Sequence, residues 1–280
     1  MKKKAVITAC SLLLLTGVGA FFVYVQNNAL TTSEHTLQLN GAAGDFGGFT
    51  IIHLSDLHGK SFGKEQRTLV KRVEAEKPDM ILFTGDLIDS NRGGADAALT
   101  LMDKMTDLAP VYFVNGNHEW QAGNWDMLKQ RLQETGVRVL SNQSETIKAG
   151  EETIRVAGIE DPASGSESYP QRAVTEENIK EVMNEEEKEP VILLAHRPEN
   201  FSLYTAKEFD LVLSGHAHGG QFRLPIAGGL IAPDQGFLPS YTSGAYEESG
   251  TTMIVSRGLG NSVIPIRVFN RPEVVKITLE

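Results

Sequence analysis

The sequence predicts one mixed α/β domain behind a single apolar helix at the N-terminus. Strand-like apolar runs alternate with helix-like stretches through the first half of the chain, and strand-like runs dominate the second half. A chain of 280 residues, 41% of them apolar and 22% charged, can bury a core of this kind. Disordered and collagen-like chains are thereby excluded.

The first element is an uncharged apolar stretch from Ala5 to Val25, directly after three lysines. As a helix, its length roughly matches the ~30 Å hydrocarbon core of a bilayer. The lysines predict that the N-terminus stays in the cytoplasm and that the rest of the chain lies on the extracytoplasmic side of the cell membrane. A cleaved signal peptide is the alternative, although its apolar region is usually only ~7–15 residues long. We therefore expect residues 1–27 to be a retained, single-pass signal anchor.

A polar, glycine-containing segment follows over residues 28–47. It predicts a flexible tether, with a short strand at Thr36–Leu39. Such a tether reaches only ~25 Å, which would keep the domain near the membrane. The domain itself is expected over residues 48–280, because we find neither an internal repeat nor a second linker there.

The elements of the domain are expected in the following order. The strands are Phe49–Leu54, Met80–Thr84, Val111–Asn115, Thr153–Gly158, Val191–Ala195, Leu211–Ser214, Thr252–Ser256 and Val274–Leu279. The helices are Lys64–Lys77, Ala95–Leu108, Trp125–Glu134 and one near Glu176–Glu187, in which Glu185–Glu187 is expected to be a solvated face.

Charge and cysteine content exclude two classes of protein. The net charge of −10 argues against a nucleic-acid binder, which needs Lys and Arg to neutralise phosphates. The single cysteine, Cys10, lies in the apolar stretch. The domain therefore has neither a disulfide framework nor a thiolate metal site.

Polar residues of the kinds that bind metals follow five of the expected strands. They are Asp56 and His58, Asp86 and Asp89, Asn117 and His118, His196, and His216 and His218. Any one of these sets alone is more often a turn than a metal site. The ends of neighbouring strands meet at one edge of an open α/β sheet, so five such ends together predict a shared site. About seven oxygen and nitrogen ligands favour two ions over one.

These motifs resemble the signature of the calcineurin-like metallophosphoesterases, over roughly Phe49 to Glu280. The matching blocks are Asp56-x-His58, Gly85-Asp86-x-x-Asp89, Gly116-Asn117-His118-Glu119, His196 and Gly215-His216-x-His218. The resemblance implies a four-layer αββα sandwich of two mixed sheets flanked by helices. It also implies two divalent cations, with Asp56, His58 and His218 on one, Asn117, His196 and His216 on the other, and Asp86 bridging both. Mn, Fe, Zn and Co all suit such ligands.

The resemblance further implies hydrolysis of a phosphoester. Two cations ~3.5–4 Å apart clamp the phosphoryl oxygens and generate the hydroxide that attacks phosphorus. His118 is not needed as a ligand and is expected to protonate the leaving oxygen. Asp89 resembles the family's partner for this histidine and would hold its ring as an imidazolium, with a loop-capping role as the alternative.

One departure from the family pattern bears on the substrate. In the protein Ser/Thr phosphatases Arg-Gly follows the second aspartate, whereas Ser90 and Asn91 follow Asp89 here. Protein dephosphorylation is therefore not expected. The chain looks more like the membrane-anchored bacterial branch, whose members resemble phosphodiesterases and pyrophosphatases acting on envelope lipids or nucleotide-linked sugars. Arg197 and Arg257 are candidate contacts to substrate phosphate, with structural roles as the alternative.

The expected function is an exported, membrane-tethered phosphoesterase acting on a phosphodiester, pyrophosphate or phosphomonoester, with an envelope phospholipid or nucleotide-linked sugar lipid as candidate substrate. The alternative is a catalytically silent envelope binding protein that keeps the metals for stability. The enzyme is favoured because every expected ligand is present. A loop rich in glycine and proline, residues 219–239, follows the last ligand. Its apolar side chains are expected either in the core or on a lip that meets lipid. His35 and His53 fall outside the motifs and are expected to be structural or solvated.

Overall fold

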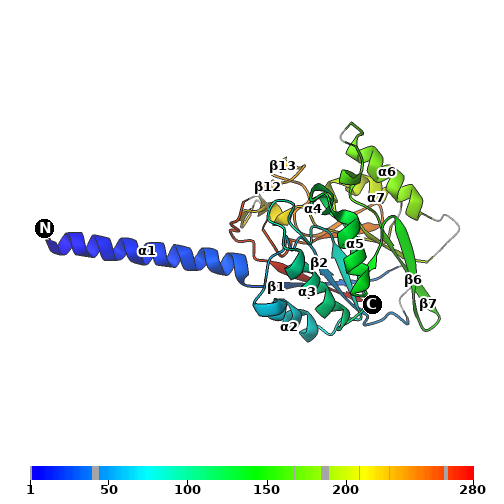
Figure 1. Cartoon of the computed structure of the whole chain (residues 1–280), viewed down its shortest axis with the longest axis horizontal. Helices are drawn as coiled ribbons and strands as arrows, with labels where there is room; N and C mark the ends of the chain where they lie inside the picture. The colour runs from blue at the N-terminus through cyan, green and yellow to red at the C-terminus, as the bar shows by residue number, and fades with distance from the viewer. Residues whose placement is uncertain are drawn as a thin grey trace.

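The computed structural model describes residues 2–39, 44–166, 168–183, 189–207, 209–226, 228–261 and 264–280. One long helix, α1 (Lys2–Asn28), projects from a domain built on two six-stranded sheets (Figure 1). The segment Val6–Asn28 of this helix is long and apolar enough to cross a membrane, with a mean hydropathy of 2.3.

The first sheet has the strand order β1-β16-β2-β3-β4-β5. Only the β16–β2 pair is antiparallel. The strands are β1 (Thr31–Leu37), β16 (Glu273–Leu279), β2 (Thr50–Leu54), β3 (Met80–Thr84), β4 (Val111–Val114) and β5 (Arg138–Val139). Because β2, β3 and β4 run in parallel, the loops that follow them leave the sheet at one edge.

The second sheet has the order β14-β15-β9-β8-β7-β6, with parallel strands at its centre and an antiparallel pair at each side. Its strands are β14 (Gly244–Glu248), β15 (Thr251–Val255), β9 (Leu211–Ser214), β8 (Val191–Leu194), β7 (Glu152–Gly158) and β6 (Gln143–Ala149). Two short antiparallel ladders lie between β9 and β14 in the chain: β10 (Arg223–Leu224) with β11 (Gly228–Gly229), and β12 (Ile231–Ala232) with β13 (Gly236–Phe237).

Helices cover the outer face of each sheet. The first sheet packs against α2 (Arg67–Ala75), α3 (Ala95–Thr106) and α5 (Trp125–Glu134), and the second against α6 (Gln171–Val182) and α7 (Phe201–Thr205). The helix α3 shows why: Ala98, Leu101, Met102 and Met105 recur at helical spacing and are all buried. A third apolar cluster fills the space between the two sheets. The predicted four-layer αββα sandwich is therefore confirmed.

Short helical turns complete the domain. They are α4 (Asn117–Gln121) and the 3-10 turns η1 (Lys64–Gln66), η2 (Pro162–Ser164), η3 (Pro198–Asn200) and η4 (His218–Gly220). The helix α4 and the turn η4 contain predicted metal ligands. Each of them begins within a few residues of the end of a buried strand.

Two sequence predictions need correction. Residues 31–37 are not part of a flexible tether, because β1 pairs along its whole length with β16. A strand was predicted nearby, at Thr36–Leu39, but the observed strand begins earlier. The helix expected near Glu176–Glu187 begins at Gln171 and ends at Val182. The predicted solvated face Glu185–Glu187 and residues 40–43 of the predicted tether lie outside the described residues.

The end of α1 is fixed to the domain by polar and aromatic contacts. The backbone N–H of Asn270 donates to Gln26 Oε1 (3.1 Å), and the Arg271 guanidinium donates to the carbonyls of Ala29 (2.8 Å) and Leu30 (2.6 Å). Phe22 meets Phe269 edge-on, with 5.5 Å between ring centroids. The helix therefore joins the domain without a free linker at this point.

Candidate metal centre

The predicted ligands gather where buried parallel strands end. Asp56 and His58 follow β2, Asp86 follows β3, and Asn117 opens α4 after β4. In the second sheet, His196 follows β8 and the pair His216 and His218 follows β9. All seven side chains are buried.

Five of these ligands have left-handed backbone conformations. They are Asp56 (φ 53°), His58 (φ 48°), Asp86 (φ 53°), His216 (φ 64°) and His218 (φ 47°). Non-glycine residues seldom adopt this region, and such residues concentrate at functional sites. The neighbouring Gly85 (φ 86°) leaves no room for a side chain, since a Cβ there would lie 2.5 Å from the nitrogen of Gly116.

The first group of ligands consists of Asp56, His58, Asp86 and His218, whose ligand atoms lie within 4.8 Å of one another. His58 Nε2 lies 3.0 Å from His218 Nε2 and 3.5 Å from Asp86 Oδ2. His218 Nε2 lies 3.4 Å from Asp56 Oδ1. The Asp56 carboxylate also accepts the backbone N–H of His216 at 3.0 Å, which links the two sheets.

The second group consists of Asp86, His196 and His216. His196 Nε2 lies 3.3 Å from Asp86 Oδ2 and 3.2 Å from His216 Nδ1. The other ring nitrogen of His196 donates to the carbonyl of Thr84 (2.6 Å), so the lone pair of Nε2 faces the group. Asp86 therefore belongs to both groups.

The side chains fit a pair of divalent cations. Two pairs of imidazole nitrogens point at each other at 3.0 and 3.2 Å, an arrangement that a cation between them would stabilise. In the described part of the chain, the buried Asn117 Oδ1 has no hydrogen-bond partner, so it is available as a ligand. Imidazole, carboxylate and amide oxygen together suit Zn, Fe, Mn and Co.

The electrostatics of the site centre on Asp86. Burial alone would raise the pKa of Asp86, but His196 and His58 outweigh burial and hold this pKa well below its ordinary value. Burial and the neighbouring His58 lower the pKa of His218 well below its ordinary value. Burial alone would lower the pKa of His196, but the charge of Asp86 raises the pKa of His196 to about 10, so in the absence of metal these two groups form an ion pair. Metal binding at this position would release the proton of His196.

The structure assigns different partners to His118 and Asp89 from those predicted. The Nδ1 atom of His118 accepts the backbone N–H of Ser90 at 3.0 Å, so this nitrogen carries no proton. The Asp89 carboxylate instead lies 3.4 Å from His58 Nδ1 and pairs with Arg92. A nitrogen or oxygen atom of each of His58, Asp89 and His118 lies within 4.8 Å of the other two, so the Asp89–His118 pair stays a prediction, although Nδ1 of His118 is occupied by the Ser90 N–H.

The two candidate substrate arginines are both paired with carboxylates. Arg197 is 4% exposed, and its guanidinium donates to both oxygens of Asp161 (2.8 and 3.2 Å) and to Asp234. This geometry favours the structural role for Arg197. The Arg257 side chain is 28% exposed and lies 3.1 Å from Glu273. His53 is structural as predicted, because it is buried and contacts Thr84 Oγ1 at 2.8 Å.

Two residues of the site escaped the sequence reasoning. Asp234, in the loop after the last ligands, lies 3.0 Å from His216 Nε2, and this contact lowers the pKa of Asp234 to about 2. Glu119 is fully buried and accepts the backbone N–H groups of Asp86, Ile88 and Gly116 at 2.7–3.1 Å. Burial and the charge of Asp86 raise the pKa of Glu119 to about 7. The sequence signal that could have identified Glu119 is its place in the Gly-Asn-His-Glu block.

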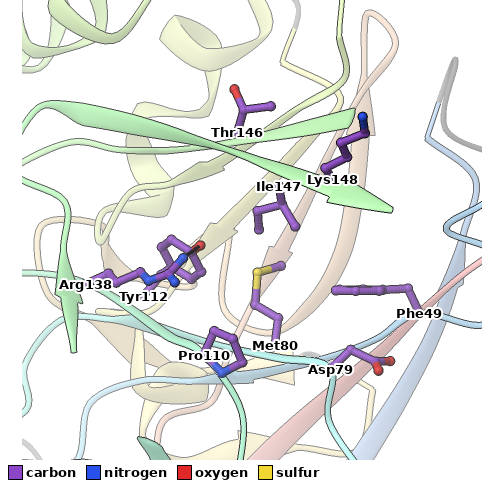
Figure 2. A pocket seen from close by; sticks show the side chains of 9 residues that line it. All are labelled: Phe49, Asp79, Met80, Pro110, Tyr112, Arg138, Thr146, Ile147 and Lys148. Carbon is purple, nitrogen blue, oxygen red and sulfur yellow. Dashed lines mark hydrogen bonds between the residues drawn. The ribbon is translucent and has the colours of Figure 1, made fainter. Parts of the chain in front are cut away.

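A separate pocket of about 240 Å³ lies at the opposite end of the first sheet (Figure 2). Its lining includes Phe49, Met80 and Pro110, which precede or begin β2, β3 and β4, whereas the metal ligands follow these strands. Figure 2 shows these side chains together with Tyr112 and Arg138 around the pocket. The pocket is therefore distinct from the metal centre.

Comparison with known proteins places this geometry in a family. The model of the calcineurin-like phosphoesterases matches residues 49–220. The chain is 29% identical to the uncharacterised metallophosphoesterase YkuE of Bacillus subtilis, over 92% of this chain and 88% of the relative. It is 31% identical to a transmembrane protein with metallophosphoesterase domain of Danio rerio, over 83% of this chain and 53% of the relative.

Two further proteins complete the comparison. Phosphodiesterase YaeI of Escherichia coli is 28% identical over 82% of each chain. The crystal structure of TT1561 of Thermus thermophilus shares the fold with a TM-score of 0.50, at 16% identity and over 76% of this chain and 90% of that one. The matched family model spans more than half of the chain and ends just after the last ligand, His218. The protein is thus a member of the calcineurin-like phosphoesterases, a family of metal-dependent phosphoric ester hydrolases.

Proposed function

We propose that the protein is a membrane-anchored phosphoesterase with two divalent cations and with its catalytic domain on the extracytoplasmic side. The observation that carries the proposal is the position of Asp86, whose carboxylate lies in both groups of ligands. A shared carboxylate suits two cations held close together.

Each side chain has a role in this proposal. Asp56, His58 and His218 would hold one cation, and Asn117, His196 and His216 the other, with Asp86 between them. The cations would supply Lewis acidity toward the phosphoryl oxygens and a nucleophile active at neutral pH. Asp89 would fix the ring of His58 so that its Nε2 faces the site, and Asp234 would do the same for His216.

His118 is the proposed proton donor to the leaving oxygen. Its Nδ1 accepts an N–H from Ser90, so the ring proton sits on Nε2 and can be donated outward. Its side chain is only partly buried, in contrast to the seven ligands. Burial lowers the pKa of His118, and Asp89 would assist this histidine through its nearby charge, which acts to raise that pKa.

The proposed substrate is a phosphodiester or pyrophosphate linkage in an envelope lipid. The loop after the ligands supports this class, because Ile231, Phe237 and Leu238 are exposed rather than packed in the core. A relative named phosphodiesterase supports hydrolysis of a diester. Arg257 is the arginine proposed to contact substrate phosphate, since Arg197 is already neutralised by carboxylates.

The reaction can be tested with the metal-loaded full chain on a phosphomonoester, a phosphodiester and a pyrophosphate side by side. We expect the diester or pyrophosphate to be hydrolysed fastest. If none of the three is hydrolysed while both metals are bound, a silent binding protein is the better description.

The lipid substrate needs its own test. Replacing Leu230 and Ile231 with serine should reduce turnover of a lipid phosphodiester in vesicles and spare a small chromogenic diester. Equal losses on the two substrates would contradict a lipid role for this loop. The proposed orientation is tested by adding protease to intact protoplasts, where digestion of the domain is expected and full protection would contradict export.

A further inference from the structure

Eight exposed apolar side chains form a surface that we call the apolar lip. Those on the loop after the metal ligands are Leu224, Ile226, Ile231, Phe237 and Leu238, and those near the last strand are Ile264, Ile266 and Phe269. The most exposed are Ile226 (101%) and Phe237 (74%). A contiguous exposed apolar patch usually marks a site that binds a protein, a ligand or a membrane.

The two segments of the lip are joined by backbone contacts. The N–H of Arg223 donates to the carbonyl of Val268 (2.9 Å), and Phe222 and Val268 form an isolated bridge. The Gln221 side chain donates to the carbonyls of Ile264 and Ile266. The lip is therefore one structure and not two unrelated loops.

The lip lies beside the end of α1. Phe269, which is 57% exposed, contacts Phe22 of α1 edge-on, and the next residue, Asn270, is hydrogen-bonded to Gln26. In Figure 1 the loop before β16 forms the side of the domain from which α1 projects. Phe269 therefore shares the environment, lipid or water, of this end of α1.

The position of Phe22 sets the depth of this contact. Phe22 lies within the apolar span Val6–Asn28, six residues before its end. At a rise of about 1.5 Å per residue, it sits roughly 9 Å below the last residue of the span. If α1 crosses a bilayer, Phe269 is held at the level of the outer headgroups and upper acyl chains rather than in water.

Charge near the same end of α1 favours a lipid surface over a protein partner. Arg67, Lys71, Arg72 and Arg271 line a cavity of about 720 Å³ together with Asn28–Leu30, and Glu76 is the acidic residue in this lining. The chain as a whole carries a net charge of −10, whereas these four basic residues make this part of the surface positive. Basic residues at the end of a membrane helix are attracted to anionic headgroups.

We propose that the apolar lip inserts into the outer leaflet of the bilayer that α1 spans, so that the domain is held at the membrane by two contacts. The inference rests on the membrane anchor of the proposed function. Asp234, which contacts His216, lies within the lip between Ile231 and Phe237. The lip therefore places the metal centre next to the lipid interface in a fixed orientation.

The single cysteine of the chain allows a direct test with the full-length protein. An environment-sensitive fluorophore is attached at Cys10 in the native sequence, or at Ile226→Cys, Leu238→Cys or Tyr169→Cys in a Cys10→Ser background. Ile226 is fully exposed, so its replacement should not affect folding, and Leu238 supplies a second position. Tyr169 is 45% exposed and lies two residues before α6, and it serves as the control because α6 lies far from α1 in Figure 1.

Each labelled protein is reconstituted in vesicles of phosphatidylcholine and phosphatidylglycerol and exposed to a lipid-borne nitroxide quencher or to aqueous iodide. We expect the nitroxide to quench positions 226 and 238 several-fold more than position 169, and iodide to show the reverse order. Adding Phe237→Asp should reduce nitroxide quenching at position 226.

Three other outcomes would overturn the proposal. Quenching at Cys10 combined with free access of iodide to position 226 would leave the anchor standing and remove the lip. Protection of position 226 from both quenchers would mean that a protein covers the lip. Absence of lipid quenching at Cys10 would remove the anchor, and the lip would fail with it.

Discussion

The metal centre and the apolar lip are neighbouring stretches of one chain with opposite properties. His216 and His218 are buried and held by contacts from both sheets, whereas Ile226, eight residues later, is fully exposed. The loop that carries most of the lip has regular pairing only in two ladders of two residue pairs each. The difference shows that the centre is complete within the domain, whereas the lip leaves an apolar surface that the domain itself does not cover.

Asp234 connects the two regions. It lies in the lip by sequence and at the metal centre by contact, since its carboxylate meets both His216 and Arg197. The variants below separate the two regions, and they run from the largest expected effect to the smallest.

Asp86→Asn should abolish activity and reduce metal content, because it removes the charge shared by both groups of ligands. Loss of a residue that only orients a ligand lowers metal affinity by ~10–100-fold, and loss of Asp86 itself should lower it further.

His118→Asn should keep both metals and lower kcat by about 10²–10⁴-fold. Elemental analysis with activity assays distinguishes the two variants, with the fully exposed Asp96→Asn as control. An empty site in His118→Asn would contradict its assignment as a non-ligand.

Asp234→Asn should weaken binding of the cation held by His196 and His216 by roughly 10–100-fold, because the ring of His216 loses its charged partner. The cation held by Asp56, His58 and His218 should be affected less. Metal titration by calorimetry measures both. Gln235→Ala is the matched control, since Gln235 holds the same loop through Tyr241 without touching a ligand. Equal weakening by both variants would indicate loosening of the loop rather than loss of the carboxylate.

His53→Gln should make the domain less sensitive to acid. Burial lowers the pKa of His53 to about 3, so the folded domain keeps this ring neutral while the unfolded chain protonates it below its ordinary pKa of 6.5. The unfolded state then binds more protons between these values, and stability falls as the pH falls through this window.

The variant removes this penalty, so between pH 7 and pH 5 it should lose about 2 kcal/mol less of its unfolding free energy than the native chain. Urea unfolding at both pH values measures this difference. Thr36→Ala, at an exposed and non-titratable position of β1, should keep the native pH dependence. An unchanged slope in His53→Gln would mean that another buried group dominates acid sensitivity.

Local sequence patterns were sufficient to find the buried strands and the side chains that cluster at their ends. The bounds of β3, β9 and α5 agree with the prediction, because each is a continuous apolar run or a strongly amphipathic stretch. All seven predicted ligands follow such strands, and the six acidic and histidine ligands fall into two groups that share Asp86. Parallel strands end at the same edge of a sheet, and this brings the side chains that follow them together.

The features that escaped prediction depend on contacts distant in the sequence. The strand β1 is polar, and its pairing with β16 carries no local signal. Asp234 lies in a loop without a motif and reaches His216 only through the fold. The partner of His118 is the backbone N–H of Ser90, which any residue except proline would supply at that position. Side-chain identity therefore cannot indicate this contact.

The pairing of β1 with β16 has a consequence for biogenesis. Thr31, three residues after α1, has its partner at Glu273, near the end of the chain. Almost the entire domain must therefore be synthesised before β1 can pair with its neighbour in the sheet. Until β16 emerges from the ribosome, β1 remains without its partner strand.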